Sequence, residues 1–274
     1  MKKFNLGLQL YSVKCAMAND FEGTLKTVSE IGYKYVEFAG YFGKSAEEIK
    51  ALLEKYGLVC ESVHQTLTAD DDAKMAAEID FLNTIGVKYV FIPWYKAENL
   101  AGTPNWEETV SKFKKMSEAL KANGMTLGYH NHDFEFARHD GKFLHDHIFD
   151  EIGRDNIIPE LDTCWVRYAG LDPALKIREF KGYVPVVHLK DFTCKQLAAG
   201  PVYDLIGGAS ASREDNGFKF RPIGQGMQNF DEILAACEES GTHTLIVEQD
   251  NSYEEGEIFA AGASYKYLSE KYGL

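Results

Sequence analysis

The sequence has few basic residues for its number of acidic ones. Its 274 residues include 29 lysines and arginines against 42 aspartates and glutamates, a formal net charge of −13. A nucleic-acid-binding surface needs clustered Lys and Arg to neutralise phosphates. The charge balance therefore disfavours nucleic acid as a partner, although it leaves room for a local basic pocket that binds a small anion.

Long apolar runs are also missing. The longest apolar-aromatic stretch runs from Tyr89 to Tyr95 and contains Pro93, whereas a transmembrane helix needs roughly 20 residues. The first residues carry two lysines but no sustained apolar region, so we expect no signal peptide. The five cysteines are scattered without a CxxC pair, which is typical of reduced thiols. We expect a cytoplasmic protein with no membrane partner.

What the chain does have is a large apolar content, 45% of residues with 13% aromatic, ample for a sizeable core. Short β-branched or aromatic runs recur along it and predict strands buried on both faces of a parallel sheet. There are eight such runs: Leu6–Tyr11, Tyr35–Phe38, Val59–His64, Tyr89–Pro93, Thr126–His130, Ile157–Asp162, Val184–Lys190 and Thr244–Glu248.

Helical patterns separate these runs, each ended by a glycine or introduced by a capping residue. The alternation predicts an α/β fold, a (β/α)8 TIM barrel with a single domain over 1–274. A doubly wound sheet is the alternative, but no GxGxxG follows a strand. The last strand-to-strand spacing is about twice the others, and its excess, Thr193–Gly226, predicts a long loop that covers the site or joins a subunit interface, as in a homo-oligomer.

Charged residues occur at strand ends where a barrel interior should be apolar. Alternate residues of a strand point to the same face. Glu160 and Asp162 therefore share a face, as do His188 and Lys190, and Glu248 and Asp250. Several carboxylates and an imidazole that converge on one rim need a cation. The pattern favours one divalent metal ion, Mn²⁺, Zn²⁺, Co²⁺ or Mg²⁺, over a network of salt bridges with Lys190 as the counter-charge.

Six motifs carry a resemblance to a known family: LGLQLYSV, YHNHDFEF, ELDTCWV, VVHLKD, RPIGQG and LIVEQD. In this order they resemble the sugar phosphate isomerase/epimerase superfamily, whose fold is a xylose isomerase-like TIM barrel. The resemblance implies a metal held by Glu135, Asp162, His188 and Glu248. Glu135 lies five residues past His130, so His130 or His132 could serve instead. Gln225 stands where the family often has Glu.

The remaining candidates are substrate contacts at the same rim. Aromatic rings cover the C–H faces of sugars, and polar groups bind their hydroxyls. The predicted substrate-binding residues are His64, Trp94, His130, His132, Glu160, Trp165 and Lys190, and Gln9, Tyr11 and Glu37 face the same rim with weaker signals.

The resemblance implies a metal-dependent isomerase or epimerase of a sugar or sugar derivative. Glu248 and Glu135 would be the catalytic pair, one removing a proton next to the carbonyl and the other returning it. A lyase that dehydrates a keto-sugar or keto-inositol at the same site is the alternative. Endonuclease IV-like DNA repair is disfavoured by the net charge, and a non-catalytic sugar-binding barrel by the intact ligand set.

Overall fold

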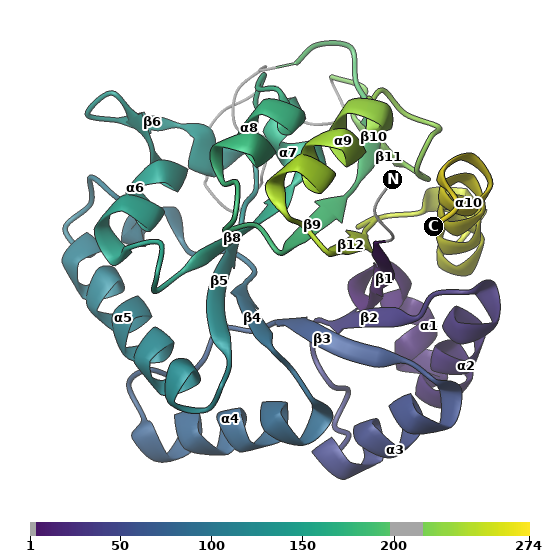
Figure 1. Ribbon diagram of the computed structural model, residues 1–274, viewed down its shortest axis with the longest axis horizontal. Coiled ribbons are helices and arrows are strands. Elements are labelled where there is room, and N and C mark those ends of the chain that lie inside the picture. Colours follow the sequence, from purple (N-terminus) through teal and green to yellow (C-terminus); the bar gives the residue numbers. More distant parts are fainter. Residues whose placement is uncertain (1–3, 198–215) are drawn as a thin grey trace.

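Eight parallel strands close into a barrel in the computed structural model, which describes residues 4–197 and 216–274. Neighbouring strands follow the order β1-β12-β9-β8-β5-β4-β3-β2, and Figure 1 looks along the barrel. The predicted α/β barrel is therefore confirmed. Its strands are β1 Asn5–Gln9, β2 Tyr35–Phe38, β3 Val59–His64, β4 Tyr89–Ile92, β5 Thr126–His130, β8 Ile158–Asp162, β9 Val186–Leu189 and β12 Thr244–Val247.

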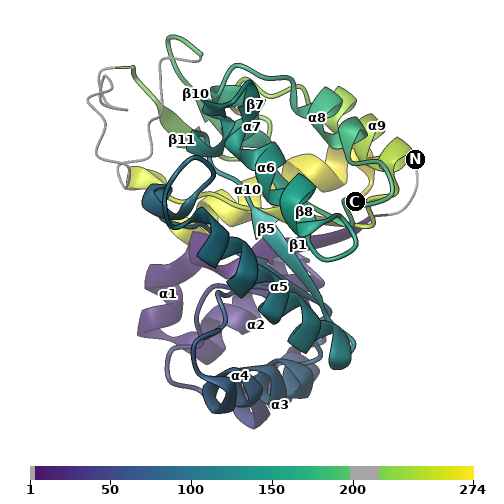
Figure 2. The ribbon, with the colours of Figure 1, turned by 90° about the vertical axis from the view of Figure 1, so that its left-hand side faces the viewer.

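Helices surround the barrel and bury their apolar stripes against the outward faces of the strands (Figures 1 and 2). The predicted caps are present: Ser45 and Glu48 form a capping box, and Asp172 caps a helix with Pro173 in its first turn. The helices are α1 Lys14–Asn19, α2 Phe21–Ile31, α3 Ala46–Tyr56, α4 Asp72–Ile85, α5 Trp106–Ala122, α6 Leu144–Ile152, α7 Thr163–Tyr168, α8 Pro173–Glu179, α9 Phe230–Ser240 and α10 Glu257–Tyr272.

The middle of the barrel is filled by an apolar layer. Phe91, Ile158, Val186 and Ile246 point inward and pack together. Glycine makes room for them, because a Cβ on Gly128 would lie 2.2 Å from the Phe91 ring. This layer seals the barrel. Two positions further along three of these strands, Glu160, His188 and Glu248 point to the same inward side and meet above the layer, at the carboxyl ends of the strands.

The structure differs from the sequence prediction at both ends of the chain and after β8. The first strand ends at Gln9, because the Gln9 side chain accepts a hydrogen bond from the Tyr11 amide and starts a 3-10 turn. The helical pattern of the sequence extends over Ser252–Tyr272, but the last helix begins at Glu257, because Gly256, at φ 86°, breaks the chain direction after a short 3-10 turn. Helix α7 was not predicted; Asp162 caps it with bonds to the amides of Cys164 and Trp165.

The long segment after β9 carries a small two-stranded sheet. Strand β10 Asp191–Thr193 pairs antiparallel with β11 Lys219–Arg221 at the end of the barrel where α7 lies (Figure 2). The Asp191 carboxylate ties this segment together by accepting bonds from the amides of Gly224, Gly226 and Gln228. The predicted covering loop falls partly on 198–215, outside the described residues.

Two further sequence expectations concern the environment of the protein. Within the described ranges, no helix has both the length and the apolarity that crossing a bilayer would require. All five cysteines are free thiols, three of them buried.

Candidate functional site

The carboxyl ends of six barrel strands, β2, β3, β5, β8, β9 and β12, bring charged side chains together. Pairing of the strands sets His130 beside Glu160 and Asp162 beside His188. Glu248 directly follows β12, where its amide bonds to the Leu189 carbonyl. All of these side chains are buried. The polar residues that interrupt the apolar strands therefore form one cluster.

The upper part of this cluster is built around the Lys190 ammonium group. Its Nζ lies 3.1 Å from Asp162 Oδ2, 2.9 Å from Glu248 Oε2 and 2.7 Å from Asp250 Oδ1. His188 Nδ1 lies 3.0 Å from the same oxygen of Glu248. Three carboxylates thus share one lysine that is 1% exposed.

The lower part is a ring of imidazoles and carboxylates inside the barrel. His64 Nε2 lies 3.0 Å from Glu37 Oε1 and 2.7 Å from Glu160 Oε2. His188 Nε2 lies 2.8 Å from Glu37 Oε1 and 3.3 Å from Glu160 Oε2, and His130 Nδ1 lies 3.1 Å from the latter oxygen. Every acidic oxygen named here faces at least one imidazole.

The lower ring concentrates charge. Burial opposes ionisation of Glu37, yet the imidazoles of His64 and His188 outweigh it and hold the pKa of that carboxyl well below its ordinary value. Burial likewise opposes protonation of His64, but Glu37 and Glu160 raise its pKa to about 10. The same two carboxylates hold the pKa of His188 well above its ordinary value. Without a metal, these imidazoles carry the protons that balance the carboxylates.

His130 and Asp162 behave differently. Burial and the neighbouring positive charges of His64 and His188 hold the pKa of His130 well below its ordinary value. Burial raises the pKa of Asp162 to about 6, against the opposing effect of Lys190. His130 is therefore a neutral imidazole with a lone pair to offer, the form that a metal requires.

The donor set fits a divalent ion. Two groups of potential ligands have their atoms within 4.8 Å of one another: His130, Asp162, His188 and Glu248 in the upper part, and His64, His130, Glu160 and His188 in the lower part. Glu160 Oε1 is buried and has no hydrogen-bond partner among the described residues. Mixed imidazole and carboxylate ligands suit Zn²⁺, Mn²⁺ and Co²⁺.

Glu135 lies apart from both groups. It sits in a 3-10 turn, Phe134–Phe136, where its Oε1 accepts a bond from the Tyr129 hydroxyl at 2.8 Å and its Oε2 accepts one from the His132 amide at 2.8 Å. Tyr129 is on the outward face of β5, within the core between barrel and helices. The turn folds Glu135 back over that face, so the structure does not place it with Asp162, His188 and Glu248.

The buried carboxyl of Glu135 should make stability pH-dependent. Burial raises its pKa to about 8, so the folded protein holds this proton more tightly than the unfolded chain does. The stability that this proton contributes is fully present below the pKa of Glu135 in the unfolded chain. It is lost as the pH rises through the pKa of Glu135 in the folded protein. Between about pH 5 and pH 8, wild-type protein should lose up to ~4 kcal/mol of unfolding free energy from this group. Glu135→Gln, which has no proton to lose, should not show this decrease. Urea unfolding across the pH range measures it.

The control is Glu61, a buried carboxyl at the opposite end of the barrel. Its Oε2 accepts a bond from the Thr244 hydroxyl, and its Oε1 pairs with Lys88. Against the effect of burial, bonds from His243 and Lys88 lower the pKa of Glu61 to about 2. Glu61→Gln should lower the unfolding free energy by a similar amount at every pH in the range, so the slope of stability against pH should match that of wild type. Parallel pH profiles for wild type and Glu135→Gln would contradict the prediction.

The predicted aromatic contacts take different places. Trp165 is fully buried in α7 and stacks on Phe218 from the β10–β11 segment, with ring centroids 5.7 Å apart. Its ring also lies 5.3 Å from Lys190 Nζ, so Trp165 covers the upper cluster. His132 is buried between His130 and Trp165, at 5.3 and 5.6 Å between centroids. Trp94 is half-buried just beyond β4.

Removal of Lys190 should destabilise the metal-free protein. In Lys190→Met the carboxylates of Asp162, Glu248 and Asp250 lose their shared cation, a change worth about 3–5 kcal/mol of unfolding free energy. A divalent ion supplies the missing positive charge, so added Mn²⁺ should recover most of this loss. Urea unfolding with EDTA and with Mn²⁺ measures both effects.

The matched control is Lys176→Met, which removes another buried lysine. Lys176 lies in α8, and its Nζ pairs with Asp146 and Glu179 at 2.7 and 2.9 Å, two carboxylates that are not part of the cluster. This variant should be less stable than wild type. Added Mn²⁺ should raise its unfolding free energy by the same amount as it raises that of wild type. If Lys190→Met lost the same unfolding free energy with and without Mn²⁺, a metal would not replace Lys190 as the positive charge beside these carboxylates.

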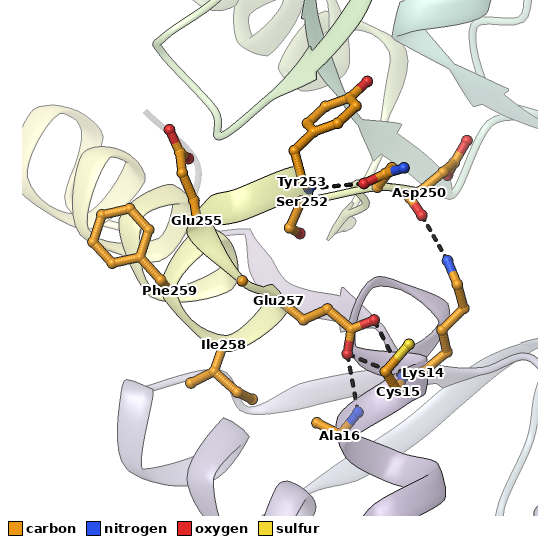
Figure 3. A pocket seen from close by; sticks show the side chains of 12 residues that line it. Lys14, Cys15, Ala16, Asp250, Ser252, Tyr253, Glu255, Glu257, Ile258 and Phe259 are labelled. Carbon is orange, nitrogen blue, oxygen red and sulfur yellow. Dashed lines mark hydrogen bonds between the residues drawn. The ribbon is translucent and has the colours of Figure 1, made fainter.

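A cavity of about 630 Å³ adjoins the cluster, between α1, the segment after β12 and the start of α10. Figure 3 shows the Glu257 carboxylate reaching the amides of Cys15 and Ala16, and Lys14 bonded to the Asp250 carbonyl. Asp250 belongs to both places, because its carboxylate pairs with Lys190. Of the cluster residues, Asp250 alone lines this cavity, on the β12 side.

Glu37 is the residue whose importance the sequence understates. Its position at the end of β2 predicts only that it faces the rim, yet it contacts His64 and His188 and accepts further bonds from Gln9 and Ser62. The available signal was a lone glutamate between Val36 and Phe38, which a solvent-facing strand residue would also give.

Comparison with known proteins matches this architecture to one family. The model of the xylose isomerase-like TIM barrel family matches residues 25–269. The chain belongs to this family. The predicted resemblance is thereby confirmed, and the buried cluster occupies the carboxyl end of the strands, where TIM-barrel enzymes place their active sites.

Individual relatives of this xylose isomerase-like barrel are distant. The chain is 23% identical over 192 residues to the inosose dehydratase of Geobacillus kaustophilus, a match that covers 61% of this chain and 60% of that one. A sugar phosphate isomerase/epimerase structure from Parabacteroides distasonis has a TM-score of 0.77 at 21% identity, covering 98% and 99%. The structure of the IOLI protein with a bound zinc atom has a TM-score of 0.70 at 15% identity, covering 97% of each chain. At these identities the likenesses establish the fold.

Proposed function

We propose that the protein is a divalent-metal-dependent isomerase or epimerase of a sugar or sugar derivative. The observation that carries this proposal is the upper cluster, in which Asp162, His188 and Glu248 converge with His130 on one buried point. Three of these residues are those that the resemblance implies, and His130 takes the place of Glu135. When bound there, a divalent ion would supply Lewis-acid polarisation of a carbonyl and so acidify the adjacent C–H.

Glu248 is the proposed base. Burial alone would raise its pKa, but Lys190 and the hydrogen bond from His188 lower it below the ordinary value. Glu248 is therefore ionised and able to accept a proton. Lys190 stays an ammonium group, because Asp162, Asp250 and Glu248 hold its pKa well above its ordinary value in spite of burial. It would donate a hydrogen bond to the substrate oxygen that gains negative charge.

The placement of Glu135 favours a one-base reaction. Its carboxylate bonds to Tyr129 and the His132 amide on the far side of β5, so it does not face a substrate beside Glu248. A single carboxylate can take a proton from one carbon and return it to the neighbouring carbon, which is 1,2-isomerisation. Inversion at one carbon needs a second donor on the opposite face.

A lyase is the second candidate, and the match to an inosose dehydratase favours it. The same proton removal by Glu248, followed by loss of a β-hydroxyl, gives dehydration. The hydrogen bond from Lys190 would then help the hydroxide leave.

The decisive test is metal dependence combined with a substrate screen. Protein stripped with EDTA is reloaded separately with Mn²⁺, Zn²⁺, Co²⁺ and Mg²⁺ and incubated in D2O with ketoses, keto-inositols and 3-keto sugars. We expect turnover with at least one ion and deuterium at the carbon next to the carbonyl. An isomeric product identifies an isomerase or epimerase, and a product lighter by one water identifies a lyase. Full activity of the stripped protein would refute the proposal.

A further inference from the structure

The carboxylate of Glu37 lies in the lower ring, where it faces one nitrogen of His188 while Glu248 faces the other. It is fully buried. Its oxygens accept bonds from Gln9 Nε2 at 2.7 Å and from the Ser62 hydroxyl, and they face His64 Nε2 and His188 Nε2 at 3.0 and 2.8 Å. Donors from three strands thus fix the carboxylate in one position, with one oxygen aimed at His188.

His188 presents its two ring nitrogens to opposite parts of the cluster. Nε2 points down to Glu37 at 2.8 Å, and Nδ1 points up to Glu248 at 3.0 Å. A neutral imidazole carries one N–H, and only its other nitrogen can bind a metal. The choice of tautomer therefore decides whether His188 serves the upper group of ligands or the lower one.

The position of Glu37 favours one of the two tautomers. Its oxygen is an acceptor held in place, so it stabilises a proton on Nε2 of His188 and leaves the lone pair on Nδ1, which faces Glu248. Ligating histidines commonly donate their second N–H to a carboxylate in this way, and loss of such a carboxylate typically weakens metal binding 10–100-fold.

A second carboxylate repeats the arrangement. His130 Nδ1 faces Glu160 Oε2 in the lower ring at 3.1 Å, whereas its Nε2 faces Asp162 Oδ2 at 3.7 Å. Both imidazoles of the upper group are thus oriented from below by acidic residues. The lower group would have to take its metal through the nitrogens that already face Glu37 and Glu160.

We propose that Glu37 is a positioning residue that fixes the Nε2–H tautomer of His188 and thereby directs Nδ1 to a divalent metal in the upper group. The inference rests on the metal-binding part of the proposed function and not on the identity of the sugar. In this arrangement the residues of the lower ring orient the histidine ligands, and the ion binds in the upper group.

The first test uses wild-type protein and Zn²⁺ as the probe. Nitrogen-15 NMR of the histidine side chains in the zinc-loaded protein distinguishes a protonated Nε2 from a protonated Nδ1. We expect the His188 signal, assigned by its loss in His188→Gln, to show Nε2–H with zinc on Nδ1. A protonated Nδ1 with zinc on Nε2 would overturn the proposal, and this result does not depend on whether any Glu37 variant folds.

The second test measures zinc affinity. Glu37→Gln keeps the shape of the side chain but places an amide where a carboxylate accepts four donors. Competition with a chelator should give a Kd 10–100-fold weaker than that of wild type, with a changed His188 nitrogen spectrum. Glu61→Gln is the matched control, a buried carboxyl at the other end of the barrel, and should keep the wild-type Kd.

Three outcomes would count against the inference. An unchanged Kd in Glu37→Gln would overturn it. A stoichiometry of two zinc ions per chain, with one lost in Glu37→Gln, would make Glu37 a ligand instead of a positioning residue. If wild-type protein bound no zinc, manganese or cobalt at all, the proposed function itself would fail, a result distinct from the other two.

Discussion

Asp162→Ala and His188→Ala should each lose the bound divalent ion. Each variant removes one ligand of the upper group, and Lys190 stays beside the carboxylates that remain. We expect the Kd for Mn²⁺ or Zn²⁺ to rise at least 100-fold, because a site of four ligands that loses one no longer has a complete coordination shell, and Asp162→Ala removes a negative charge as well. Equilibrium dialysis followed by elemental analysis gives the occupancy directly.

The fourth ligand can be identified in the same experiment. If His130 completes the set, His130→Ala should lose metal and Glu135→Gln should keep it. The opposite result would restore the ligand set implied by the sequence motifs, and would require the turn at Phe134–Phe136 to rearrange when metal binds. Wild-type occupancy in both Asp162→Ala and His188→Ala would show that the upper group is not the metal site.

The barrel could be predicted because its physical signals are local. Each strand is a short apolar run, each helix has a stripe and a cap, and the period of two puts Glu160 with Asp162 and His188 with Lys190 on inward faces. These patterns are enough to bring the charged strand ends to one rim. They do not say which residue on one strand meets which residue on another.

Glu135 and Glu37 show why the site needed a structure. Glu135 follows β5 by five residues, and whether it turns inward depends on a 3-10 turn held by the Tyr129 hydroxyl. Glu37 depends on the pairing of β2 with β3, where a register shift sets Glu37 opposite Ser62. The first outcome is set by hydrogen bonds within a local turn and the second by a register shift between two strands, and neither leaves a trace in hydrophobic periodicity.

The environment of Trp165 could not be predicted from the sequence either. Trp165 looks like a sugar-stacking residue in the motif ELDTCWV, but Phe218 and Phe220 cover it. Those two residues belong to the segment after β9, about fifty positions further along the chain. The sequence predicted a long loop there, and only the pairing of β10 with β11 shows that its described part packs on α7.

Glu248→Gln should abolish most turnover while leaving the fold intact. The glutamine keeps the shape of the side chain and one oxygen that can face a metal, but its amide nitrogen cannot accept the proton that the Glu248 carboxylate would take. Loss of a general base typically costs 10²–10⁴-fold in rate, and we expect a fall of at least about 10²-fold on the substrate that the screen identifies. Because Glu248 is also a proposed ligand, the rates are compared at saturating metal, with occupancy measured in the same samples.

Solvent deuterium separates loss of the base from loss of the metal. In wild-type protein, a measurable share of the product should carry deuterium, because the proton held by the Glu248 carboxyl group exchanges partly with solvent before it is returned. Metal-saturated Glu248→Gln should lose exchange and turnover together, whereas Glu61→Gln, which alters a buried carboxyl at the other end of the barrel, should keep both. Exchange at the wild-type rate in Glu248→Gln would show that this carboxylate is not the base. Product formed by wild-type protein without any deuterium would point to a hydride shift between carbons, in which no side chain carries the proton, and the role given to Glu248 would have to be abandoned.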